Sequence, residues 1–209
     1  LILTKAGKEL LGGVHAEAFR DGVNRFISDD RFDEFNRINH VRGQTGKGKR
    51  GMTYPSERRD AICVSMSEWP PGRWIRFEDA FRFTFASGSP FTLTDSPWHL
   101  YFSELRYGHL SAGGDDLERQ YSRAFFLESA ATLGLIDVAY TSPHWLWPEL
   151  SDGWGIDDLD FCGRYDGLLY VRLNPLGAYC MGIADDYQPP PVEQRDVLKV
   201  LPNRELAIT

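Results

Sequence analysis

The feature that most limits how this chain can fold is a long helical pattern that runs into two strand patterns. Residues 115–133 begin with acidic side chains, as the helix dipole favours, and Gly134 follows as a stop signal. The segments 136–140 and 168–173 are both typical of strands, and they can pair around the loop between them. We therefore expect one long helix followed by two strands with a protruding loop.

Shorter elements precede this unit. Ser56 is a favoured N-cap residue, and the helix that it begins should end at Pro70–Gly72. Ile62, Cys63, Met66 and Trp69 fall on one face of that helix. The other expected elements are a helix over 14–28, a short extended piece at Trp74–Ile75, a helix over 77–85, and an irregular excursion over 87–114 with a strand near Leu100–Phe102.

The order of these elements between about Ser56 and Gly182 resembles the winged-helix fold. The resemblance is carried by the long helix that runs into Leu135–Val138 and by the returning strand Tyr170–Leu173. The sequence departs from the family pattern in the insertion after the second helix and in a wing of roughly 25 residues over 141–167, which is long for a compact domain. The expected fold class is α+β and helix-rich.

Both ends of the chain suggest neighbouring domains. Leu3–Gly12 can be laid over Leu173–Gly182, each with a strand leading in, a cap, a short helix and a glycine, although coincidence remains an alternative. Residues 198–208 are typical of a hairpin and resemble the start of a domain that follows winged helices in some helicase-associated proteins. We expect four parts: 1–28 as the end of a preceding winged-helix-like unit, 29–55 as a basic Gly-rich loop or linker, 56–183 as the winged-helix-like domain, and 184–209 as a linker and the start of a β unit. Residues 56–182 should fold independently.

Composition narrows the class of protein. A chain of 209 residues with 42% hydrophobic residues can bury one sizeable core or two small ones. The mean hydropathy of −0.37 and the short apolar runs favour a protein that spans no membrane. Three widely spaced cysteines favour a reducing, cytoplasmic location. The net charge of −7 argues against a surface that is basic throughout, so any nucleic-acid site must be local.

The segment Gly43–Lys49 matches the GxxxxGK pattern of phosphate-binding loops. That chemistry needs a Ser or Thr hydroxyl on magnesium at the next position, where this chain has Arg50. A buried strand before the loop and an apolar helix after it are also missing from the sequence. We therefore expect no nucleotide site, and the sequence indicates no cofactor.

The same stretch is notable for its charge. Residues 37–59 hold seven basic side chains against the single acid Glu57. A flexible basic loop can follow a phosphate backbone and release counterions. A solvated surface loop is the alternative interpretation. The candidate contacts are Arg42, Lys47, Lys49 and Arg50.

The long helix is the second candidate for nucleic-acid contact. In the winged-helix interpretation it is the helix that enters the major groove, where Arg and Gln can reach base edges. An apolar stripe that includes Leu117, Tyr121 and Phe125 should face the core, which leaves Arg119 and Arg123 exposed on the other side. Gln120 and Ser122 complete the candidate set. The acidic first turn opposes this role, and an ordinary amphipathic helix with solvated arginines is the alternative.

Other chemistry finds little support in the sequence. The acidic, Trp-rich wing lacks the oxygen spacing of a calcium loop, so we expect its Trp145, Trp147 and Trp154 to anchor the loop or to face another domain. The chain has no GxSxG, SxxK or HExxH motif, and its five histidines are far apart.

The leading hypothesis is a non-catalytic, nucleic-acid-binding winged-helix module of a larger protein, with weak, salt-sensitive affinity for duplex nucleic acid. The alternative is a docking module that uses the same fold to bind other domains of the parent protein. An enzyme with a dispersed active site is a third class. The sequence leaves open which of these applies.

Overall fold

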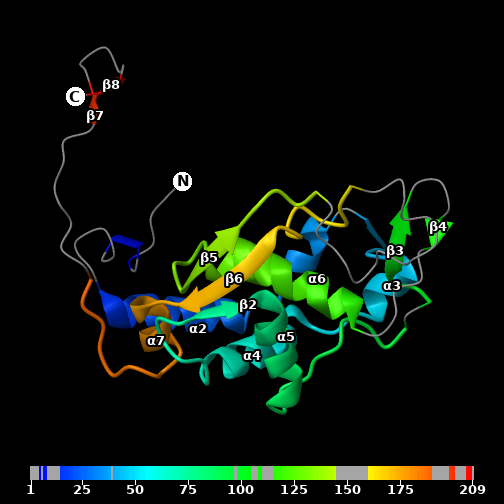
Figure 1. The fold of residues 1–209 in the computed structure, drawn as a ribbon, viewed down its shortest axis with the longest axis horizontal. Coiled ribbons are helices and arrows are strands. Elements are labelled where there is room, and N and C mark those ends of the chain that lie inside the picture. Colours follow the sequence, from blue (N-terminus) through cyan, green and yellow to red (C-terminus); the bar gives the residue numbers. More distant parts are fainter. Residues whose placement is uncertain are drawn as a thin grey trace.

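The computed structural model describes residues 15–38, 40–96, 98–104, 108–109, 115–144, 160–189, 198–200 and 206–208, together with residues 5, 7 and 8. The fold is α+β and helix-rich, as the sequence predicts (Figure 1). The helices are α2 (Ala16–Ile27), the 3₁₀ helix η1 (Glu34–Arg37), α3 (Gly46–Arg50), α4 (Pro55–Met66), α5 (Phe77–Ala86), α6 (Asp116–Ala124), the π-helical η2 (Phe125–Ala130) and α7 (Pro175–Cys180). The strands are β1 (Val41–Arg42), β2 (Trp74–Arg76), β3 (Tyr101–Glu104), β4 (Gly108–His109), β5 (Ile136–Tyr140), β6 (Leu168–Leu173), β7 (Leu198–Val200) and β8 (Leu206–Ile208). None of the helices described is long and apolar enough to cross a bilayer.

Three strands form the main antiparallel sheet, in the order β2-β6-β5. The two strands expected to pair do so, with Val138 opposite Val171. The short extended piece at Trp74 pairs with the other edge of β6, where Trp74 lies opposite Arg172. One face of this sheet is in the core, because Val171 and Leu173 have no exposed surface. The helices α5 and η2 pack against the strands, and Figure 1 shows α6 running behind the sheet.

The remaining strands form two smaller antiparallel sheets. One has the order β1-β3-β4 and includes the strand expected near Leu100–Phe102. The other is the hairpin of β7 and β8, which confirms the pairing expected for residues 198–208.

Three local expectations need correction. The helix α4 ends at Met66, before Trp69 and before the Pro70–Gly72 segment that was expected to end it. The N-cap of α4 is Tyr54 rather than Ser56, because Pro55 takes the first helical position, where its missing N–H removes no helical hydrogen bond. The long helix also changes character midway, since η2 continues α6 with wider turns. The Ala131 amide donates to the Phe126 carbonyl, five residues earlier. Gly134 then ends the segment in a left-handed conformation, as predicted.

Arg59 and Glu34 form an ion pair in the centre of the fold. Both side chains have no exposed surface, and the Arg59 Nε atom lies 3.0 Å from Glu34 Oε1. The two Nη groups of Arg59 donate to Glu34 and to the backbone carbonyls of Phe26, Asp29 and Phe32. All five guanidinium N–H groups therefore have acceptors, which a buried charge requires.

The Glu34 carboxylate joins this pair to the long helix. Besides Arg59, it accepts hydrogen bonds from the Tyr121 hydroxyl, at 3.2 Å, and from the Ser129 hydroxyl. One carboxylate thus connects η1, α4, α6 and η2. Arg59 also donates to the carbonyl of Phe26, in the last turn of α2, and to that of Asp29, just beyond the end of this helix, so it ties α2 to α4.

A second ion pair lies beside the first. The fully buried Arg58 binds both carboxylate oxygens of Asp33, at 3.1 and 2.9 Å, and stacks over the Tyr121 ring at 4.7 Å. Asp33 also caps η1 by accepting from the Phe35 amide. The adjacent arginines of α4 are thus held by the adjacent acids before and within η1.

These contacts change how residues 29–55 are understood. The sequence suggested a loop or linker, whereas Phe35 and Ile38 belong to the same buried cluster as the long helix. A fragment that begins at Ser56 would leave two buried guanidinium groups without their carboxylates. The structure therefore argues against independent folding of residues 56–182, and the division into four parts stays a prediction.

We predict that Glu34→Gln lowers the free energy of unfolding by about 3–5 kcal/mol, because it leaves the Arg59 charge buried without a counter-ion. Urea denaturation measures this loss. The control is Arg31→Ala, which removes a 90% exposed partner of Asp29 and should leave the midpoint nearly unchanged. Equal losses in the control and in Glu34→Gln would contradict the assignment.

Candidate functional site

The α6 helix lies in the interior, so the expected exposure of its polar side is wrong. Gln120, Ser122 and Arg123 are each exposed by 3% or less, and the Arg119 side chain by only 12%. The expected apolar stripe is buried as well, with Tyr121 and Phe125 at 2% or less. A helix that is buried all round cannot also lie in a DNA groove.

The helix α5 packs against the side of α6 that the sequence predicted to be exposed to solvent. Glu78 of α5 pairs with both Arg119 and Arg123. The guanidinium groups of the two arginines also lie over aromatic rings of the same helix, Arg119 over Phe81 at 4.4 Å and Arg123 over Phe77 at 4.7 Å. Stacking on rings and pairing with Glu78 together account for the burial of two charged side chains.

The polar residues beside these arginines also have internal partners. The Gln120 amide donates to Asp166 at 2.8 Å, and the Ser122 hydroxyl donates to the Glu118 carbonyl. Arg123 lies 3.9 Å from the same Asp166 carboxylate. Burial raises the pKa of Asp166, while its hydrogen bonds to the Gly163 and Cys162 amides favour the charged form. The polar face of α6 therefore forms a hydrogen-bond and ion-pair network inside the protein, and it does not present a surface that could contact DNA bases.

The excursion between α5 and α6 covers the start of the long helix. Glu118 accepts from the Leu93 amide at 2.8 Å, and its pKa is raised because it is buried. The Phe91 ring packs against Tyr121 at 5.7 Å. The insertion that sets this chain apart from the winged-helix pattern is thus part of the core, and it occupies the space in front of α6.

The basic candidates of the 37–59 stretch divide into two groups. Arg42 on β1, together with Lys47, Lys49 and Arg50 on α3, are exposed as expected. Arg58 and Arg59 are buried and neutralised, so the stretch presents less positive charge than its sequence suggests. Lys49 also lies 3.6 Å from Asp33. The exposed positive charge of this stretch therefore comes from the short helix α3 and from Arg42 of β1.

The GxxxxGK pattern has a packing explanation in this structure. A Cβ atom on Gly43 would lie 1.6 Å from the His99 carbonyl oxygen, and Gly43 has a φ of +89°. A Cβ atom on Gly48 would lie 2.0 Å from the Gly43 oxygen. Both glycines let α3 fit closely against residues 99–100. The helix α3 itself has only five residues.

We predict that Gly48→Ala lowers the free energy of unfolding by about 1–3 kcal/mol, because its Cβ would overlap backbone atoms. Gly51→Ala is the matched control, since its nearest neighbour would lie at 3.5 Å, an ordinary contact.

Isothermal titration of the wild type with magnesium and ATP should release no heat. Saturable ATP binding that Lys49→Ala abolishes would show that the pattern does bind phosphate.

The acidic wing lies mostly outside the described residues, including Trp145, Trp147 and Trp154. Among the residues that are described, no group of three or more His, Cys, Asp or Glu side chains is placed to hold a metal ion. The three cysteines are buried and form no disulfide. Burial raises the pKa of Cys63 to about 12, with the Asp60 carboxylate as the next cause, so this thiol is not activated as a nucleophile.

The outer face of the main sheet carries exposed aromatic side chains that were not predicted from the sequence. Trp74 is 43% exposed and Tyr170 is 41% exposed, on neighbouring strands. Arg172 lies between Trp74 and Asp137, 4.6 Å from the Trp74 ring and 2.6 Å from the carboxylate. Arg76 is exposed opposite Tyr170. The alternation of β2 and β6 would have placed these side chains on one face, had the strand pairing been known.

A cavity of about 310 Å³ opens at the edge of this face. Its apolar walls come from Phe77, Leu168 and Leu169, and Arg76 and Tyr170 also line it. Arg123 and Asp166 contribute charged groups that are already paired. The cavity has room for a side chain of a partner.

Comparison with protein-family models, with curated proteins and with solved structures finds no match to this chain.

Proposed function

We propose that this chain is a non-catalytic docking module with a winged-helix-like arrangement, and that it binds a protein partner through the outer face of the β2-β6-β5 sheet. The observation that carries the proposal is the exposure of Trp74 and Tyr170 on adjacent strands, next to a cavity. Aromatic residues are enriched at the centres of protein interfaces, where they provide large apolar contacts with few rotatable bonds.

The order of elements supports the winged-helix-like arrangement. From residue 55 to residue 173 the chain runs α4, β2, α5, α6 with η2, β5 and β6. The first strand pairs with the last one and not with its neighbour in sequence, which gives the sheet order β2-β6-β5. The resemblance rests on this order of elements and on the pairing of β5 with β6.

Protein docking fits the charges better than DNA reading does. The helix that would enter a major groove has its arginines paired with Glu78 and Asp166 inside the protein. On the sheet face, Arg172 is paired with Asp137. The whole chain carries a net charge of −7, which repels a phosphate backbone.

We predict that a photo-crosslinking phenylalanine analogue at Tyr170 forms a discrete adduct with a protein in cells of the native source. The same analogue at Phe83, which is 37% exposed on α5, is the matched control and should give no adduct of that mass. Adding Trp74→Ala should abolish the Tyr170 adduct, because the partner would lose its aromatic contact. A nuclease-sensitive adduct at Tyr170, or identical adducts at both positions, would overturn the docking function.

Nucleic-acid binding remains a second candidate because Arg42, Lys47 and Arg50 are exposed. The exposed side chains of this basic surface can contact phosphates, whereas the arginines of α6 face the interior. We expect duplex DNA affinity no tighter than roughly 10⁻⁴ to 10⁻⁶ M at physiological salt.

In a gel-shift titration at two salt concentrations, the variant Lys47→Ala/Arg50→Ala should reduce the slope of log affinity against log salt by about one per residue. Arg119→Ala/Arg123→Ala should leave the slope unchanged in the folded fraction, because both side chains face the interior. No detectable binding at low salt would exclude this candidate. Loss of binding only in the α6 variant would restore the sequence-based assignment.

A further inference from the structure

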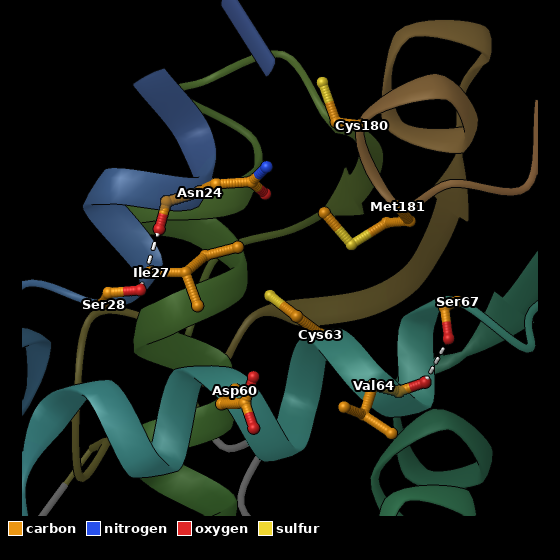
Figure 2. A pocket seen from close by; sticks show the side chains of 9 residues that line it. All are labelled: Asn24, Ile27, Ser28, Asp60, Cys63, Val64, Ser67, Cys180 and Met181. Atoms are coloured by element: carbon orange, nitrogen blue, oxygen red, sulfur yellow. Dashed lines mark hydrogen bonds between the residues drawn. The ribbon is translucent and has the colours of Figure 1, made fainter. Parts of the chain in front are cut away.

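A separate groove of about 400 Å³ lies between α2, α4 and α7, away from the residues of the sheet face (Figure 2). Ile27, Cys63 and Met181 provide apolar and sulfur-containing surface in the groove, and Figure 2 shows the Cys63 and Met181 side chains directed toward one another. Asn24 and Ser28 line the α2 side, and Asp60, Val64 and Ser67 line the α4 side. The groove thus combines an apolar floor with polar rims.

The exposed side of α4 supplies one of these rims. The helix directs Arg58, Arg59 and Ile62 into the core, which leaves Glu57, Asp60 and Val64 on the outside at helical spacing. Val64 is 46% exposed although it is apolar. Val64 therefore offers apolar surface beside Asp60 at the rim of the groove.

The charge of the groove is negative on the α4 side. Asp60 is exposed and forms no ion pair within the described part of the chain. The arginines that follow Glu57 on the same helix are buried against Asp33 and Glu34, so they do not offset this charge. Arg20 of α2 lies near the α7 end, where it stacks over the Tyr179 ring at 4.6 Å. The Asp60 end is therefore open to a cation.

We infer that this groove binds a basic amphipathic helix of a protein partner. The apolar side chains of the partner helix pack against Val64 and against the groove floor, which is formed by Ile27, Cys63 and Met181. A Lys or Arg of the partner helix pairs with Asp60. Amphipathic helices bind hydrophobic grooves in this way, with charges at the rim selecting the partner. The flexible thioether of Met181 can adapt to different apolar side chains. This site is independent of the sheet face and goes beyond the docking function proposed above.

The test uses two fluorescein-labelled peptides with the full chain. One repeats Leu on a helical face with Lys on the other, and the second has Glu in place of every Lys. Fluorescence anisotropy should show saturable binding of the Lys peptide only. Asp60→Lys should weaken that binding by about tenfold or more, because it places a cation where the partner needs an anion. Val64→Ser should also weaken it.

The matched control is Asp79→Lys on α5, which changes the net charge equally at another exposed site and should alter the affinity by less than about twofold. A photo-reactive leucine in the Lys peptide should crosslink to residues 60–67 or to Met181. Equal effects of Asp60→Lys and Asp79→Lys would mean non-specific attraction and would overturn the site. Binding of both peptides, or crosslinks confined to the sheet face, would do the same. Melting curves confirm that each variant is folded.

Discussion

The buried pairs Arg58–Asp33 and Arg59–Glu34 are the interactions on which the rest of the structure depends. Glu34 alone accepts hydrogen bonds from α4, α6 and η2, and Arg59 satisfies carbonyls at the end of α2. A buried charge is tolerated only when its partner and its remaining hydrogen-bonding groups are all in place. The network therefore fixes how four helices meet, because a displacement of any of them would leave a charge unpaired in the interior.

This arrangement decides which surfaces can bind a partner. Tyr121 of α6 is held against Glu34 and Arg58 on one side, while Phe77, Glu78 and Phe81 of α5 cover the arginines on the other. The long helix is thus the centre of the core. In the part of the chain that the structure describes, the surfaces that we consider for binding are the outer sheet face, the basic α3 helix and the groove beside α4.

Several elements could be predicted because their signals are local. The strands β5 and β6, the helices α2 and α5, and the glycine that ends the long helix follow from apolar periodicity and stop residues. The Asn174 cap of α7 is also local, since its side chain accepts from the amide three residues later. The burial of Arg58 and Arg59 had a signal too, because they continue the face of Ile62, Cys63 and Met66 back by one turn. Charge made that face look solvated, and the matching acids lie 25 residues away.

By itself the sequence determined the type and order of the elements, because helix stripes, strand runs and turn residues act over a few positions. It also determined that the GxxxxGK segment lacks the hydroxyl of a phosphate-binding loop. Only the tertiary structure decided which charged residues are inside. Whether an arginine binds phosphate or anchors a core depends on whether Glu78, Asp33 or Glu34 reaches it across the fold, and helical spacing cannot encode that contact. The outer sheet face could not be predicted for the same reason, because Trp74 and Tyr170 become neighbours only when β2 pairs with β6.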